Sequence, residues 1–234
     1  MLLSFKRKTN LNPCRKKRRT IGRPITVRPT NHAAAPPPMS TFERYYQDLL
    51  DWEEVSFTPL ISPWSDTDAQ AIADDFTQAV TRSGVRDMQV TIRPGSTNQS
   101  VGNQVEAFFI GRVSGLLQQF RVLDCPGHGY PDRQLREHSG SRRFPLELKA
   151  TSQWNPSDSN RRVLTSSSKK LRENFVAPIC HLLTTICYDI AGSDHRISRV
   201  RLDFIQPTTE VSVRLEASVN HKILSSGGHT SRTI

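Results

Sequence analysis

The sequence is poor in the groups that build metal-thiolate sites, disulfide frameworks and membrane spans. Its four cysteines show no C-x-x-C spacing, so we interpret them as reduced cytoplasmic thiols. His128 and His138 are too isolated for a zinc site or a histidine nucleophile. No apolar run approaches the length of a membrane span, and the start lacks the apolar region of a secretory signal. We therefore expect a cytoplasmic protein with no membrane contact.

Acidic residues are missing from residues 1–38. This segment carries ten Lys and Arg and no Asp or Glu, which equals the formal net charge of +10 of the whole chain. It has no apolar period and ends in AAAPPP, so we expect a disordered basic tail or a mis-assigned start. Three interpretations stay open: a nucleic-acid-binding arm, an Arg-rich targeting segment, or a translated upstream region with the true start at Met39.

The rest of the chain divides by charge. Residues 39–75 carry nine acids against Arg44 alone, whereas residues 76–234 carry 21 bases against 13 acids. A basic surplus of this size suits a polyanionic partner. Apolar spacing predicts packing helices over Thr41–Trp52 and from Ser65 or Asp66 to Arg82, within an N-terminal helical region of residues 39–97. Together these features predict one domain with a tail.

Two short β-like segments carry the acidic residues of greatest interest. They are Tyr130–Leu135 and Phe144–Gln153, and the segment between them, which contains Ser-Gly-Ser, predicts the turn of a hairpin. Because strand side chains alternate, Glu147 and Lys149 lie on one face of the second strand. The hairpin would bring Asp132 close to Glu147. Two carboxylates and an ammonium are the minimum set for metal-assisted phosphodiester hydrolysis.

The pattern of Pro131-Asp132 followed by Glu147-Leu148-Lys149 resembles the PD-(D/E)xK motif of the restriction-endonuclease-like superfamily. The resemblance implies an α/β fold with a mixed β-sheet flanked by helices, here over a core of residues 98–225. It also implies magnesium held by Asp132 and Glu147, with the Leu148 carbonyl as a third ligand and Lys149 acting on the attacking water. Type II restriction enzymes of this superfamily usually cut double-stranded palindromic DNA as homodimers.

A helix predicted over Asn98–Phe120 precedes the motif, and Glu106 lies at the flank of its apolar stripe. In the superfamily this helix often contributes a glutamate to the metal site, so Glu106 is a further candidate ligand and catalytic residue. The alternative is a surface glutamate beside Arg112 or Gln119. Asp124 is the alternative to Asp132 as the first metal ligand, but the spacing from Asp132 to Glu147 fits a hairpin better.

A polar loop and a short helix after the motif are the expected DNA-binding surface, because their side chains suit base edges and phosphates. The alternative is a solvated surface loop. The candidate DNA-binding residues are Asn160, Arg161, Arg162, Ser166, Lys169 and Lys170.

The apolar residues of Pro178–Ile190 also fit a helix, but Thr184, Thr185 and the β-branched content favour a strand. Alternating apolar residues predict two more strands, over Ile197–Ile205 and Val211–Val219, and residues 226–234 are expected to be flexible. Three functions remain open. The first is a sequence-specific type II restriction enzyme, the second a DNA-repair or junction-resolving nuclease, and the third a DNA-binding module that keeps the fold without catalysis. A complete set of Asp132, Glu147 and Lys149 argues against the third.

Overall fold

The computed structural model describes residues 39–234, apart from 128, 153–167, 177, 216–220 and 228–229. The basic segment 1–38, with the three interpretations of it, lies outside the described residues. None of the helices described is both long enough and apolar enough to cross a membrane.

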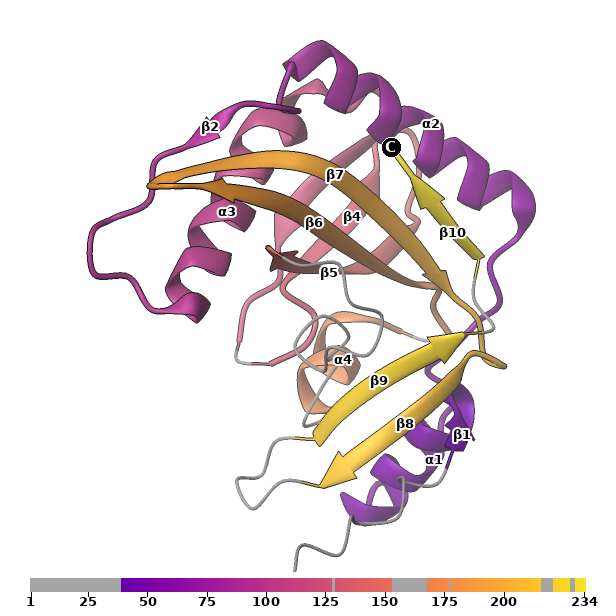
Figure 1. Cartoon of the computed structure of the whole chain (residues 1–234). Coiled ribbons are helices and arrows are strands. Elements are labelled where there is room, and N and C mark those ends of the chain that lie inside the picture. Colours follow the sequence, from indigo (N-terminus) through magenta and orange to yellow (C-terminus); the bar gives the residue numbers. More distant parts are fainter. Residues whose placement is uncertain (1–38, 128, 153–167, 177, 216–220, 228–229) are drawn as a thin grey trace, which may run out of the picture. The chain divides into compact units, whose positions relative to one another are not determined.

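The described chain contains both helices and strands, with most helices in its first half and an unbroken run of strands from β6 to β10 (Figure 1). The helices are α1 (Phe42–Trp52), α2 (Asp66–Ser83), α3 (Asn98–Val113), a 3-10 turn (Ser114–Leu116) and α4 (Lys169–Asn174). The strands are β1 (Met39–Thr41), β2 (Gln89–Val90), β3 (Phe120–Asp124), β4 (Arg133–Glu137), β5 (Arg143–Thr151), β6 (His181–Ala191), β7 (Asp194–Ile205), β8 (Glu210–Leu215), β9 (His221–Gly227) and β10 (Thr230–Thr233).

The main sheet is mixed and has the order β10-β7-β6-β5-β4-β3, with β2 pairing β7 as well. Within it β5 and β6 are parallel, while the other named pairs are antiparallel. A second, smaller sheet has the order β1-β8-β9. The sheet curls and helices flank it (Figure 1), which confirms the predicted α/β class with a mixed sheet.

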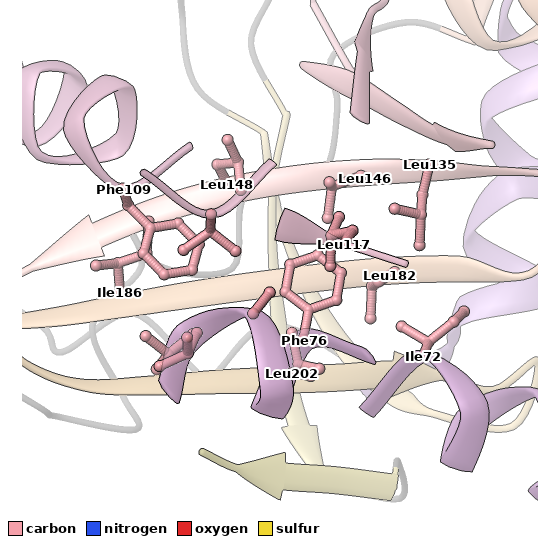
Figure 2. Close-up of a cluster of buried hydrophobic side chains, with 14 of the residues drawn as sticks. Ile72, Phe76, Phe109, Leu117, Leu135, Leu146, Leu148, Leu182, Ile186 and Leu202 are labelled. Carbon is pink, nitrogen blue, oxygen red and sulfur yellow. The ribbon is translucent and has the colours of Figure 1, made fainter. Parts of the chain in front are cut away.

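Each face of the main sheet has its own apolar cluster. On one face α2 and α3 pack against alternate residues of β5, β6 and β7, and Phe76 and Phe109 are fully buried there (Figure 2). Burying a side chain of this size stabilises the fold by about 1.5–3 kcal/mol. On the other face α1 and α4 pack against a separate set that includes Leu171, Leu183 and Tyr130. Leu182 and Leu183, consecutive residues of β6, therefore point into different layers.

The first two helices begin where the sequence predicts. Thr41 caps α1 by accepting a hydrogen bond from the Arg44 amide at 3.2 Å, and Ser65 caps α2 by accepting one from Asp68 at 3.1 Å. Gly84 follows α2 with a φ of 62°, a left-handed conformation that glycine adopts without the steric cost of a Cβ.

The helix predicted over Asn98–Phe120 is too long. α3 ends at Val113, and the chain passes through a 3-10 turn into β3, a strand that the sequence reading missed. The cause is the buried carboxylate of Asp75 on α2. It accepts hydrogen bonds from the backbone amides of Gln118, Gln119 and Phe120 at 2.7, 2.9 and 3.1 Å. These amides are therefore satisfied outside a helix.

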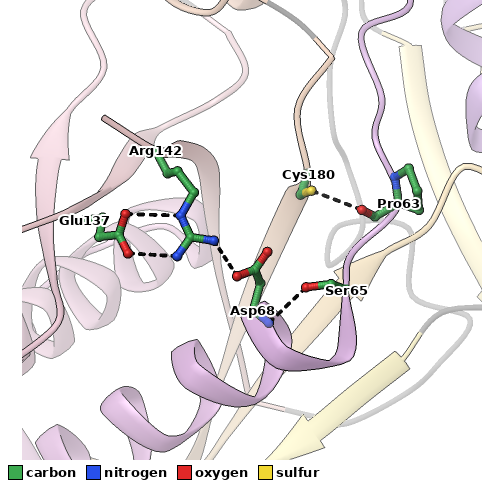
Figure 3. A network of polar contacts seen from close by, with 6 residues as sticks. All are labelled: Pro63, Ser65, Asp68, Glu137, Arg142 and Cys180. Carbon is green, nitrogen blue, oxygen red and sulfur yellow. Dashed lines mark hydrogen bonds and ion pairs between the residues drawn. The ribbon is translucent and has the colours of Figure 1, made fainter. Parts of the chain in front are cut away.

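The β4–β5 hairpin is confirmed, with its first strand shifted toward the C-terminus. β4 spans Arg133–Glu137, so Asp132 stands just before it instead of inside a strand at Tyr130–Leu135. Arg142 in the turn donates to both carboxylate oxygens of Glu137, at 3.1 and 2.7 Å, and contacts Asp68 at the start of α2 (Figure 3). The bidentate pair closes the hairpin turn, and the contact between Arg142 and Asp68 joins the hairpin to α2.

The later strands lie where the sequence predicts them. β6 and β7 occupy the segments predicted over Pro178–Ile190 and Ile197–Ile205, and β8 occupies the described part of the third. The C-terminal segment 226–234 differs from the expected flexible end, because Thr230–Thr233 forms β10 and pairs with β7. Residues 39–97 contain the two predicted helices, but these pack into the same clusters as the core of residues 98–225.

Candidate active site

An open stretch of the β5 edge organises the site. The pairing of β4 with β5 ends at Arg133 opposite Leu146, while β5 continues to Thr151 alongside β6. Past Leu146 the free backbone amides of β5 are contacted by carboxylates and not by β4. The Leu148 amide lies 3.5 Å from Asp132 Oδ2, and the Ala150 amide donates to Glu106 Oε1 at 3.0 Å. In a strand the N–H and C=O of one residue point to the same edge, so the Leu148 carbonyl faces this side too.

Asp132, Glu147 and Lys149 form one polar cluster. Lys149 Nζ lies 2.6 Å from Glu147 Oε1 and 3.7 Å from Asp132 Oδ2. The Asp132 amide donates to Glu147 Oε2 at 3.0 Å, which locks the start of β4 to β5. Glu147 is 4% exposed, whereas 41% of the Asp132 side chain is exposed. The cluster thus has a buried end at Glu147 and an accessible end at Asp132.

Burial and mutual repulsion perturb the charges of this cluster. Burial raises the pKa of Glu147 to about 8 although the Lys149 ammonium opposes the change, and Asp132 raises it further. Burial likewise raises the pKa of Glu106 to about 7, again opposed by Lys149 and reinforced by Asp132. Burial alone would lower the pKa of Lys149, but Glu147 and Asp132 outweigh it and raise that pKa. Lys149 is therefore an ammonium at neutral pH.

Glu106 belongs to α3 and reaches the same open edge of β5 as Asp132. Its neighbours Val105 and Phe109 are buried in the apolar cluster, which fixes the helix against the sheet. The carboxylate then reaches the backbone of β5 at Ala150. The Glu106 side chain therefore lies against β5, the strand that carries Glu147 and Lys149.

A cavity of about 410 Å³ opens beside these carboxylates. α3, β5, α4 and the loop between β3 and β4 contribute to its wall. The residues that line it are Asn103, Glu106, Ala107, Cys125, Gly127, Gly129, Asp132, Arg133, Leu148 and Lys170. Asp132, Glu106 and Leu148 therefore face one common space.

A buried aromatic pair supports the loop that carries Asp132. Tyr130 stacks on His181 with ring centroids 5.6 Å apart, and the Tyr130 hydroxyl lies 2.5 Å from His181 Nδ1. His181 Nε2 lies 3.0 Å from the Leu60 carbonyl, so this nitrogen carries the proton and Nδ1 accepts from the tyrosine. Burial lowers the pKa of His181 to about 4, which keeps the ring neutral. Neither residue stands out in the sequence, because their contact joins positions 51 residues apart.

The alternative acid lies apart from the cluster, and the described candidate DNA-binding residues occupy two different environments. Asp124 pairs with Arg133, and 85% of its side chain is exposed. Lys169 and Lys170 begin α4, one exposed and the other in the cavity wall. The remaining candidates, Asn160, Arg161, Arg162 and Ser166, lie outside the described residues.

Sequence reasoning missed the cavity position of Lys170, together with Arg133 and Cys125. The available signal was weak: two glycines just before Pro131-Asp132. Gly127 and Gly129 both have positive φ, of 102° and 87°, and they turn the loop toward α4.

The donor set suits a hard divalent cation that keeps part of its water. No group of three or more His, Cys, Asp and Glu in the described part of the chain is arranged to hold a metal ion. Two carboxylates, Asp132 and Glu147, with the Leu148 carbonyl give a mixed oxygen set instead, and Mg²⁺ is usually bound by one or two carboxylates with waters. Burial and like charge raise the pKa values of Glu147 and Glu106, and a bound cation would offset both effects. The oxygen donors of Asp132 and Leu148 at the cavity are of the kind that Mg²⁺ prefers.

Comparisons with known proteins add little to this geometry. No protein-family model matches the chain, and no curated protein matches it. Among solved structures, a likeness was found to the restriction endonuclease BglI bound to its DNA recognition sequence, with a TM-score of 0.31 and 12% sequence identity. It covers 71% of this chain and 71% of that one. At this level the likeness carries no argument about fold or function.

Proposed function

We propose that the chain is a metal-dependent endonuclease that hydrolyses DNA phosphodiester bonds, with a restriction-endonuclease-like core of the PD-(D/E)xK kind. The observation that supports this most is the convergence of two other segments on the strand that carries Glu147 and Lys149. Asp132 and Glu106 of α3 both contact backbone amides of β5, and Lys149 lies beside Glu147 and Asp132. A surface hairpin with exposed charges would need no such buried and mutually repelling carboxylates.

In this proposal Asp132, Glu147 and the Leu148 carbonyl would hold Mg²⁺, and Glu106 would support the same site. When bound, the ion supplies a lower pKa for a coordinated water and positive charge beside the phosphate oxygens. Asp132, as the accessible end of the cluster, binds from the cavity side. Glu147 holds the buried side and keeps the Asp132 backbone in place.

Lys149 acts as a cation. Its raised pKa leaves it protonated, so it orients the attacking water and stabilises negative charge that develops at phosphorus. The neighbouring carboxylates hold the ammonium in position before substrate arrives. This preorganisation lowers the cost of reaching the transition state.

Double-stranded DNA is the proposed substrate, and a homodimer in the cytoplasm is the proposed form. The basic surplus of residues 76–234, 21 bases against 13 acids, suits a polyanion. A sequence-specific type II restriction enzyme is the first candidate, since that role combines the proposed site with a palindromic DNA target.

Incubation of the purified protein with supercoiled plasmid and Mg²⁺ tests the function. Discrete linear fragments are the expected result and indicate sequence-specific cutting. Cutting confined to branched or damaged DNA would favour a repair or junction-resolving nuclease. DNA binding without cleavage, across several divalent metals and plasmids, would contradict the enzyme and leave a DNA-binding module.

A further inference from the structure

Two adjacent lysines at the start of α4 lie in opposite environments. Lys169 points to solvent, with 74% of its side chain exposed and Glu173 3.8 Å away. Lys170 is 6% exposed and lines the cavity beside the carboxylate cluster. Lys169 is thus a surface residue, whereas Lys170 is part of the cavity wall.

The loop before Asp132 is shaped to receive Lys170. Lys170 Nζ donates to the Gly129 carbonyl at 2.8 Å, and its stem passes beside Gly127. A Cβ at Gly127 would lie 3.6 Å from Lys170 Cγ, and the φ of 102° there disfavours any other residue. A carbonyl satisfies one of the three N–H groups of an ammonium but supplies no countercharge. A cation this deeply buried is costly unless an anion joins it.

The other cations of the site are engaged by carboxylates. Lys149 lies against Glu147 and Asp132, and Arg133 pairs with Asp124. Of the described residues that line the cavity, Lys170 and Arg133 carry positive charge, and Asp132 and Glu106 carry the acids. A phosphodiester placed in this cavity would lie between the carboxylates of Asp132 and Glu106 and the ammonium of Lys170.

We propose that Lys170 is a further catalytic residue, whose ammonium contacts a non-bridging oxygen of the phosphodiester held in the cavity. This inference rests on the proposed endonuclease function. In the hydrolysis a water oxygen bonds to phosphorus and the bond from phosphorus to one ester oxygen breaks. The water releases a proton to solvent, and the leaving oxygen takes one up. Lys170 stabilises the charge that builds on the phosphate oxygens.

The two lysines provide a matched pair of variants. Lys170→Gln removes the charge but keeps an N–H donor for the Gly129 carbonyl, so the loop keeps its hydrogen bond. Single-turnover cleavage of plasmid at saturating protein should fall about a hundredfold, as for loss of one transition-state donor. Lys169→Gln should weaken DNA binding instead. Its affinity for a short duplex in Ca²⁺ should be lower, and the salt dependence of that affinity should fall by about one unit of slope. Its single-turnover cleavage rate should fall by less than about threefold.

Two further readouts separate catalysis from support of the loop. The Mg²⁺ concentration for half-maximal cleavage should be the same in Lys170→Gln and the unaltered protein, and the thermal midpoint should be similar. Lys170→Arg, which keeps the charge, should retain at least tenfold more activity than Lys170→Gln. Full recovery of Lys170→Gln at high Mg²⁺, or an unchanged cleavage rate, would overturn the inference. An unaltered protein that never cuts would instead contradict the endonuclease function itself.

Discussion

Glu147 is a buried carboxylate whose two oxygens contact different groups, the Lys149 ammonium and the Asp132 amide. Such a group is costly unless both its charge and its lone pairs are satisfied. The same contacts join β4 to β5 and hold Asp132 at the rim of the cavity. At the scale of single residues, the proposed chemistry and the local stability therefore depend on the same atoms.

Protonation of His181 at low pH is expected to destabilise the folded chain. Its pKa is lowered from 6.5 to about 4, mainly by burial, and the Leu60 carbonyl opposes the change slightly. Tyr130 and Tyr46 are the titratable groups that face the ring. The folded chain therefore resists a proton that the unfolded chain accepts, so stability is fully present above about pH 6.5. It is lost as the pH falls toward 4, by roughly 3 kcal/mol.

Urea unfolding of the metal-free protein at pH 7 and pH 4.5 measures this contribution. Glu106 and Glu147 act in the opposite sense, because their pKa values are raised and they destabilise the fold as the pH rises. The useful quantity is therefore the difference between the unaltered protein and His181→Gln. The variant should lose less stability on acidification by about 2–3 kcal/mol. Equal losses would mean that His181 is not buried as a neutral ring.

At the scale of elements, Asp75 determines where α3 gives way to β3. Replacing it with Ala would leave three backbone amides without their carboxylate, and each hydrogen bond to a charged group contributes about 1.5–3 kcal/mol. We expect Asp75→Ala to lower the free energy of unfolding by at least about 3 kcal/mol. Its neighbour Asp74 is exposed and contacts Gln70, so Asp74→Ala should cost under about 0.5 kcal/mol. Equal effects in chemical denaturation would contradict this role.

The same residue explains what the sequence can and cannot reveal. Period-two alternation was sufficient to place Glu147 and Lys149 on one face of β5, and apolar spacing, with a cap at Ser65 or Asp66 for the second helix, was sufficient to predict α1 and α2. The end of α3 depends on Asp75, more than forty residues away along the chain, so no local pattern signals it. Lys170 is a similar case, since its place in the cavity follows from how α4 packs on a distant loop.

At the scale of the whole described chain, the site depends on the parallel pairing of β5 with β6 in a mostly antiparallel sheet. β4 begins at Arg133 and pairs with β5 only as far as Leu146, while β6 pairs with β5 in parallel through Thr151. Part of β5 is thereby covered on one edge and open on the other. The two apolar clusters fix α3 and α4 near this edge, so Glu106 and Lys170 enter one cavity from separate layers. The sheet topology thus assembles acids and cations that the sequence keeps apart.

Single-turnover cleavage of bound DNA by Lys149→Ala tests the central claim most directly. The substitution leaves Asp132 and Glu147 in place, so DNA binding in Ca²⁺ should stay within about threefold of the unaltered protein, because a single charge is lost. Cleavage in Mg²⁺ should fall about a hundredfold, which corresponds to on the order of 3 kcal/mol of lost transition-state stabilisation. Folded Lys149→Ala protein that cuts plasmid at the unaltered rate would contradict the assignment of the catalytic site to this edge of β5.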